Sequence, residues 1–478
     1  MDKKYKNLGA NTILVFIGNA GSKLIALLLL PFYTRWLTVS DYGVTDIITV
    51  YSTLLVGLFS CCIYDALLVF PKGKDETCKR TYFTSGANFL FLANLLTIVI
   101  FYILSFFFKK LGFENSFANY IWYIFLIMVS DSILKCTQNF CRSIDKMKIY
   151  SVTGVLVTLF TALFSFILIP YFGVKGYVIS IAVANISSSL FAFLITRSYC
   201  YYDLALFKLS SCKEMLLYSV PLIPNAIMWW IVSALNRPLM EKYVGLEGIG
   251  FFAVANKFPG IIAMLFSVFL VSWQISVLEE YGKNGYSFFY NRVFKLFIMM
   301  SSLLWIGITL FSKSMIMLFT TSNYYSAWQY IPILALGTLF SNIGGFVGCN
   351  FSAVRKSKYY FYSSVWSAIC AIILNLLLIP IYGVWGAVFS FTISLMVMAV
   401  TRILYSWKYV PIRNLNHYCF LLVLDLSVFL LLFYNVSILF LFVDCLILIV
   451  VHVYFNKDEI KDVFSFLMRK QINYKLKK

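Results

Sequence analysis

A lysine within an apolar segment is the first residue whose type and position suggest chemistry. Lys23 lies in the stretch FIGNAGSKLIALLLLPFYTRWL, residues 16–37, inside a run that could cross a bilayer. Placing a lysine at the centre of a membrane helix costs about 2.5–3.5 kcal/mol on insertion scales. We therefore interpret Lys23 first as a functional residue, with a structural ion pair to a nearby carboxylate as the alternative.

Other apolar segments also hold charged side chains. Arg237 and Lys257 lie toward the outer ends of their segments, so they could contact a cargo or extend to the membrane interface. Asp46 and Asp65 share one segment, where they could pair with the cations, Lys23 included, or carry a coupling proton or sodium ion. A third pattern, Asp131 and Lys135 at a spacing of four, places both on one helix face and indicates a structural pair.

The composition indicates that membrane helices position these residues. Of the 478 residues, 61% are hydrophobic and 12% are charged, whereas a soluble domain has about 25% charged residues. The apolar runs are too long and lack the alternation expected of β-barrel strands. The sequence predicts an all-α polytopic membrane protein with about fourteen spans. They lie near residues 10–36, 43–69, 81–108, 118–138, 149–170, 174–196, 217–240, 249–278, 292–312, 327–351, 360–380, 384–406, 417–434 and 436–455.

The distribution of basic residues predicts the orientation. With the N-terminus inside, 28 of the 39 lysines and arginines, Arg402 among them, fall in inside segments and 6 fall in outside loops. This asymmetry predicts a multi-pass protein with both termini in the cytoplasm. It also explains the net charge of +19 without a nucleic-acid partner. The last residues, 457–478, are expected to form a basic amphipathic tail on the membrane or a simply solvated one.

Several kinds of chemistry have no support in the sequence. There is no phosphate-binding GxxxxGK[ST] motif, so ATP is not the expected energy source. The 11 cysteines form no paired CxxC motifs and there are two histidines, so we expect no metal site and no cofactor. A membrane enzyme would need a catalytic cluster on the outer face, where the loops are short. We therefore expect a transporter without catalytic residues.

An internal repeat organises the chain. ILIPYFGVKGYVIS at 167–180 returns as LLIPIYGVWGAVFS at 377–390, and 12 of the 35 positions in 146–180 are identical 210 residues later. Six spans per unit would place both units in the same orientation, as parallel repeats about an axis along the membrane normal. The sequence predicts two six-helix lobes, residues 1–205 and 206–410, followed by two C-terminal spans at 411–456.

Three segments resemble a known family. NTILVFIGNAGSKLIALLLLPFYTRWLTVSDYGVTDII, YSVPLIPNAIMWW and GIGFFAVANKFP resemble helices one, two, seven and eight of the bacterial O-antigen and capsule polysaccharide flippases. These belong to the multidrug/oligosaccharidyl-lipid/polysaccharide flippase superfamily. The matching residues are Gly18, Asn19, Ser22, Lys23, Pro31, Tyr33, Leu37, Tyr42, Gly43, Asp46, Ser219, Pro221, Pro224, Arg237, Gly250, Ala253, Asn256 and Lys257.

The resemblance implies a function. Such a protein would move an undecaprenyl-pyrophosphate-linked oligosaccharide from the inner to the outer leaflet of the bacterial cytoplasmic membrane by alternating access, for surface polysaccharide synthesis. Membrane lipid, a polysaccharide polymerase and glycosyltransferases are the implied partners. If spans 1, 2, 7 and 8 line the cavity, Lys23, Arg237 and Lys257 would contact the pyrophosphate. The further candidates for binding the sugar or pyrophosphate are Asn19, Asn225, Asn256 and Trp230.

Two related transporters remain alternatives. A multidrug and toxin extrusion antiporter would favour acidic cavity residues for cationic drugs, and twelve spans are usual in that branch. A lipid II flippase shares the fourteen-span plan, and in related lipid flippases the last two spans form an apolar groove for the lipid tail. The sequence favours the polysaccharide flippase over the antiporter and leaves the lipid II flippase open.

Overall fold

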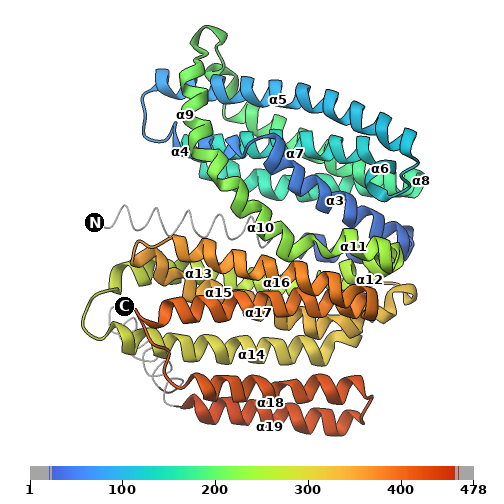
Figure 1. The fold of residues 1–478 in the computed structure, drawn as a ribbon, viewed down its shortest axis with the longest axis vertical. Coiled ribbons are helices and arrows are strands. Elements are labelled where there is room, and N and C mark those ends of the chain that lie inside the picture. The colour runs from blue at the N-terminus through green and yellow to red at the C-terminus, as the bar shows by residue number, and fades with distance from the viewer. Residues whose placement is uncertain (1–20, 22–23, 458–460, 462–478) are drawn as a thin grey trace, which may run out of the picture. The chain divides into compact units, whose positions relative to one another are not determined.

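The computed structural model describes residue 21, residues 24–457 and residue 461, and within them all regular secondary structure is helical (Figure 1). Eleven helices are long and apolar enough to cross a membrane. Thirteen of the predicted spans coincide with described helices, and the first is described from Leu24 onward. The prediction of an all-α polytopic membrane protein is therefore confirmed.

The helices follow one another with short connections. Their bounds are α2 Leu30–Trp36, α3 Val39–Phe59, α4 Ile63–Val69, α5 Glu76–Leu111, α6 Ser116–Asn119, α7 Ile121–Ser143, α8 Met147–Ile195, α9 Leu209–Ser219, α10 Ile223–Ala234, α11 Asn236–Tyr243, α12 Leu246–Ala255, α13 Pro259–Glu280, α14 Tyr286–Phe319, α15 Ile331–Ala353, α16 Lys358–Tyr382, α17 Val384–Trp407, α18 Leu415–Phe433 and α19 Ile438–Phe455.

These helices form two compact units. The first contains the described residues up to Lys257 together with 318–325 and 371–390, and the second contains 258–317, 326–370 and the described residues from 391 onward. The predicted lobe boundaries at 205, 410 and 456 stay predictions. The predicted tail, 457–478, lies outside the described residues except for Lys457 and Lys461.

Two glycines allow α3 and α12 of the first unit to cross closely. A Cβ atom on Gly43 would lie 2.1 Å from the carbonyl oxygen of Leu246, and one on Gly250 would lie 2.0 Å from that of Val39. The two contacts are equivalent. Gly43 meets the residue four positions before Gly250, and Gly250 meets the residue four positions before Gly43. Any side chain here would separate the helices. The crossing holds α3, which carries Asp46 one turn further on, against α12.

The start of α3 is set by a reciprocal cap. The Thr38 hydroxyl accepts a hydrogen bond from the Asp41 amide at 3.1 Å, and the Asp41 carboxylate accepts one from the Thr38 amide at 3.2 Å. This capping box satisfies two amides that the helix cannot pair. It fixes the beginning of α3 and hence the positions of the cavity-facing residues along it.

The internal repeat has the same backbone geometry in both copies. Gly173 and Gly383 have φ values of +53° and +58°. A Cβ atom on Gly176 would lie 2.3 Å from the Leu168 carbonyl oxygen, and the matching distance at Gly386 is 2.2 Å, to Leu378. Residues eight apart in a straight helix are separated by about 12 Å, so the chain reverses sharply at both places. Within α8, this reversal separates the predicted spans 149–170 and 174–196.

The last two spans are separate helices. Helix α18 ends at Phe433, α19 begins at Ile438, and Asn435 between them has a φ of +52°. Asp425 and His452 hydrogen-bond across this pair at 2.9 Å, with exposures of 1% and 0%. A buried polar bridge of this kind holds neighbouring membrane helices together.

Candidate functional site

A cavity of about 490 Å³ lies within the first unit, between α3 and α10. Its wall is mixed, with aliphatic side chains, two indoles, three neutral polar side chains, a phenol and two cations. The described residues that line it include no aspartate or glutamate. They are Val50, Thr53, Leu54, Gly57, Leu58, Tyr64, Lys135, Ile223, Ala226, Ile227, Trp229, Trp230, Ser233, Ala234, Arg237 and Asn256.

The sequence of α9 to α11 explains why this wall is segmented. Helix α9 ends at Ser219, a short 3₁₀ turn holds Pro221, and α10 restarts with Pro224 in its first turn. A proline removes a backbone donor and cannot continue a regular helix. The segment 209–243 is therefore broken into the separate helices α9, α10 and α11. Trp230 and Ser233 of α10 line the cavity, and Arg237 follows on α11.

Arg237 is the most constrained cation of the wall. Its Nε atom donates to Asp46 Oδ2 at 3.0 Å, its Nη1 donates to Asn236 Oδ1 at 2.8 Å and to the Ser233 carbonyl, and its guanidinium lies 4.6 Å from the centre of the Phe252 ring. The side chain is 5% exposed. Arg237 also lines the cavity, so its guanidinium can contact a ligand there.

Lys135 supplies the second cation. Its Nζ atom lies 2.9 Å from Asp131 Oδ2 and 5.3 Å from the centre of the Tyr64 ring. The Lys135 and Asp131 side chains are 34% and 26% exposed. The structural pair expected from the four-residue spacing is therefore formed, and it also places its lysine on the cavity wall. An ammonium has three donors, so one carboxylate does not saturate it.

Trp230 lines the cavity, and its polar edge is occupied. The indole Nε1 donates to the Val50 carbonyl of α3 at 2.9 Å. This bond ties α10 to α3 and fixes the ring against the cavity. A fixed aromatic face beside amide and hydroxyl groups is suited to stacking on the C–H face of a sugar.

The structure brings together some of the sequence-predicted residues. Arg237, Asn256 and Trp230 line one cavity, and Asp46, which is not among its lining residues, pairs with Arg237. Lys257 and Asn225 are exposed and are not among the residues that line this cavity.

The remaining candidates lie elsewhere or outside the described chain. Asp65 accepts a hydrogen bond from Asn139 Nδ2 at 3.4 Å and does not line the cavity. Lys23 and Asn19 lie outside the described residues. Sequence reasoning did not place Lys135 in the site, although a lysine in an apolar span was the available signal. Among the described residues, no group of three His, Cys, Asp or Glu could hold a metal ion.

Similarity to known sequences supports a family. The family model described as polysaccharide biosynthesis protein matches residues 8–273, more than half of the chain. An uncharacterized membrane protein of Methanocaldococcus jannaschii is 22% identical over 428 residues, which cover 84% of this chain and all of that protein.

Similarity to solved structures supports the same superfamily fold. The lipid II flippase MurJ in an inward closed conformation superposes with a TM-score of 0.62 at 17% identity, covering 94% of this chain and 99% of that one. A multidrug resistance transporter of the same superfamily in an inward-facing conformation gives 0.59 at 15% identity, covering 82% and 94%. A superfamily transporter from Pyrococcus furiosus, described as having a binding pocket of reverse polarity, gives 0.57 at 16% identity, covering 83% and 94%. The predicted resemblance is thereby confirmed.

Proposed function

Because this chain belongs to the polysaccharide biosynthesis protein family, we propose that it is a flippase for an undecaprenyl-pyrophosphate-linked oligosaccharide. It moves this lipid from the inner to the outer leaflet of the bacterial cytoplasmic membrane by alternating access, with both termini in the cytoplasm. The observation that carries the proposal is the cavity of the first unit, whose described wall holds two cations and no carboxylate.

The chemistry of this wall suits an anionic sugar head group. Arg237 and Lys135 would offer N–H donors to pyrophosphate oxygens, while Asp46 and Asp131 hold the two cations in place. Asn256, Ser233 and Trp230 suit the attached sugar by hydrogen bonds and stacking. The volume of about 490 Å³ falls within the range of small-molecule sites.

Other predicted residues complete the proposal. Lys23 would add a third cation, with Asn19, Asn225 and Lys257 as further contacts along the path. Since Asp46 binds Arg237, Asp65 is the carboxylate that we propose for a coupling proton or sodium ion. A polysaccharide polymerase and glycosyltransferases would consume and supply the glycan.

A lipid II flippase is the second candidate. It is favoured by the extent of the structural match, since MurJ covers 94% of this chain, whereas the multidrug transporter covers 82%. Both candidates carry a pyrophosphate-linked glycan, so the same cations would serve either. The antiporter alternative is less favoured, because a cationic drug would meet Arg237 and Lys135 on the cavity wall.

Depleting the protein in its own host and extracting the lipids tests the proposal. We expect undecaprenyl-pyrophosphate-linked oligosaccharide to accumulate facing the cytoplasm while the surface glycan is lost, because synthesis continues and translocation stops. Mass spectrometry of the extract identifies the sugar, and re-expression of the wild-type gene is the control. Accumulation of lipid II with arrested wall synthesis would select the second candidate. An unchanged glycan with altered sensitivity to cationic drugs would contradict both.

A further inference from the structure

A stripe of polar side chains on α7 leads from the cavity of the first unit to Asp65. Asp131, Lys135 and Asn139 follow one another at a spacing of four, so they share one face of the helix. Helix α4, which carries Asp65, packs against α7. Lys135 lines the cavity, whereas Asp65, Asp131 and Asn139 are not among its lining residues. The lysine is therefore the member of this group that a ligand in the cavity can contact.

Asp131 holds this lysine directly. Lys135 Nζ lies 2.9 Å from Asp131 Oδ2. Because an ammonium has three donors, an anion in the cavity can contact Lys135 while Asp131 keeps its bond. Asp131 would therefore stay paired when the cavity is occupied.

Asp65 is held less firmly than Asp131. Asn139 Nδ2 lies 3.4 Å from Asp65 Oδ1, and it donates to the Tyr64 carbonyl at the shorter distance of 2.9 Å. Among the described residues, Asp65 forms no salt bridge. Lys135 and Arg142, both on α7, stabilise its negative charge at longer range. The charged form of Asp65 therefore depends on the charge of a lysine that lines the cavity.

The other helices against α4 supply charges that already have partners. Helix α4 also packs against α5 and α9. Lys79 of α5 pairs with Glu76 at 2.7 Å, and Glu214 of α9 accepts a hydrogen bond from the Tyr82 hydroxyl at 2.8 Å. The other charged or titratable side chains on these parts of the four helices and on the turn before α4 are Cys61, Cys62, Tyr64, Cys78, Arg80, Cys136, Cys141, Cys212, Lys213 and Tyr218. Lys135 and Arg142 are the cations that act on the charge of Asp65.

We propose that a pyrophosphate head group in this cavity and a proton on Asp65 bind together, a proposal that rests on the function proposed above. An anion that contacts Lys135 offsets the positive charge that stabilises the Asp65 carboxylate. Losing that stabilisation favours the protonated carboxyl. A proton from the cytoplasmic solution then adds to a carboxylate oxygen of Asp65. By reciprocity, protonation of Asp65 strengthens the binding of the head group.

The surroundings of Asp65 favour a proton over a sodium ion. Metal cations of this kind are held by several oxygen ligands. The group beside Asp65 Oδ1 is instead the N–H donor of Asn139, and two cations act on the carboxylate. The proton also offsets part of the negative charge that a pyrophosphate brings into the membrane, where an uncompensated charge is costly. The head group and the proton therefore occupy the site together and do not compete for it.

Binding of undecaprenyl pyrophosphate to the purified full-length protein tests this linkage. In weakly buffered detergent solution, a pH-indicator dye reports proton uptake, and titration calorimetry gives the affinity at several pH values. We expect proton uptake on binding and an affinity that falls as the pH rises, by up to about tenfold per pH unit, the limit for one linked proton. Asp65→Asn should bind at least as tightly, take up fewer protons and lose this pH dependence. The ligand's own proton exchange is common to both proteins, so the difference between them reports Asp65.

Two further variants test the route through the lysine. Lys135→Gln should bind more weakly and also lose the proton uptake, because the charge that links the two sites is gone. Asp65→Glu keeps a carboxylate and should keep the uptake, so these two variants carry the test if Asp65→Asn does not fold.

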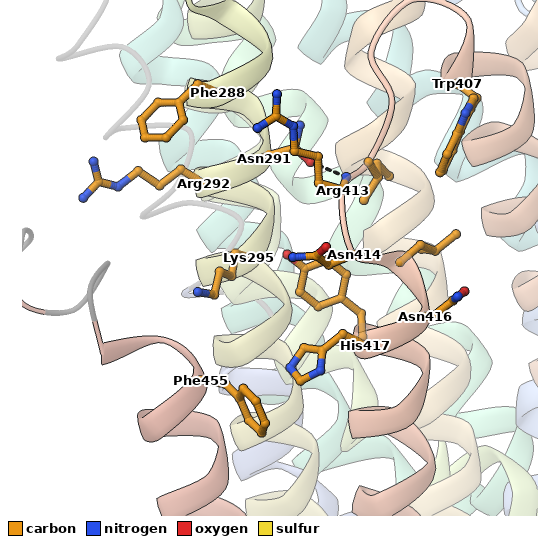
Figure 2. Close-up of a pocket in the computed structure, with 13 residues that line it drawn as sticks. Phe288, Asn291, Arg292, Lys295, Trp407, Arg413, Asn414, Asn416, His417 and Phe455 are labelled. Atoms are coloured by element: carbon orange, nitrogen blue, oxygen red, sulfur yellow. Dashed lines mark hydrogen bonds between the residues drawn. The ribbon is translucent and has the colours of Figure 1, made fainter.

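Two matched controls remove charges elsewhere. Glu114→Gln removes an exposed carboxylate of the first unit. Arg413→Gln removes an exposed cation that lines a separate cavity in the second unit (Figure 2). Both should take up as many protons as the wild type.

Several results would overturn the linkage. Unchanged uptake in Asp65→Asn, with loss of uptake in Asp131→Asn, would place the proton on Asp131. Proton release on binding would show competition, and an affinity that depends on sodium and not on pH would assign Asp65 to sodium. Undecaprenol, which lacks the pyrophosphate, should cause no uptake, and equal uptake with it would remove the role of the anion. A protein that binds no undecaprenyl pyrophosphate at all would contradict the proposed function itself, and the linkage with it.

Discussion

Two buried arginines, one in each unit, are held in opposite ways. Arg237 in the first unit and Arg402 in the second are 4% and 5% exposed. Arg237 faces the carboxylate of Asp46 at 3.0 Å. Arg402 instead donates to the Ser363 hydroxyl at 3.1 Å and to the Gly344 carbonyl at 3.0 Å. Each guanidinium also lies over an aromatic ring, that of Phe252 or Tyr360.

The difference teaches what each arginine does. A buried charge is costly unless its donors are satisfied, and both residues meet this requirement. Asp46 pairs with Arg237, and this arginine also lines a cavity, where it can contact an anion. Arg402 joins α17 to α15 and α16 through neutral groups and is not among the residues that line the cavity of the first unit. We infer that Arg402 has a structural role, which is to hold α17 against α15 and α16.

Replacing Arg237 with methionine should have the largest effect on stability. The variant leaves the Asp46 carboxylate, which is 17% exposed, without its partner, and breaking a buried pair costs about 3–5 kcal/mol. Chemical unfolding of the detergent-solubilised protein, followed by tryptophan fluorescence, measures the loss. Asp46→Asn/Arg237→Met removes the stranded charge and should recover more than half of it. A single variant as stable as the wild type would show that the pair is not strongly coupled.

Replacing Arg402 with methionine should cost less, about 1–3 kcal/mol, the penalty for buried acceptors left without a donor. No carboxylate is stranded here, because the partners of Arg402 are a hydroxyl and a carbonyl. The same unfolding measurement applies, and glycan export per folded molecule should stay at the wild-type level. A destabilisation as large as that of Arg237→Met would mean that the nature of the partner does not matter. Loss of export at normal protein levels would show that Arg402 has a role in transport in addition to its structural role.

The sequence predicts what is encoded locally. The spans follow from apolar runs, the internal repeat from the Pro-x-x-Gly-x-x-Gly pattern shared by its two copies, and the Asp131–Lys135 pair from its spacing of four. The Asp46–Arg237 pair joins residues 191 apart in the chain. The spacing of residues along the chain therefore could not distinguish this pair from the other possible pairs of Asp46, such as one with Lys23.

The burial of Arg402 near the end of a span also could not be predicted from the sequence. Arg402 lies within the last two turns of α17, and we counted it with the inside segments. The structure buries it, because α15 and α16 cover that end of the helix with Gly344 and Ser363. Similarly, the sequence identified Gly43 and Gly250 as matching the family, but their direct backbone contacts require the two helices to be placed in space.

Replacing Lys135 with methionine should have the smallest effect on stability. This variant therefore distinguishes a role of Lys135 in the cavity from a role in stabilising the fold. Lys135 and Asp131 are 34% and 26% exposed, and partly exposed pairs contribute about 0–1 kcal/mol. If the cavity receives an anionic head group, export should nevertheless fall severalfold, and Lys135→Arg should keep most of it. Surface glycan is measured at matched protein levels, with Lys148→Met as an exposed control. Unchanged export in Lys135→Met would show that the Asp131–Lys135 pair has only the structural role that its spacing indicates. Arg237 would then be the cavity's only cation, among the described residues, for an anion to contact.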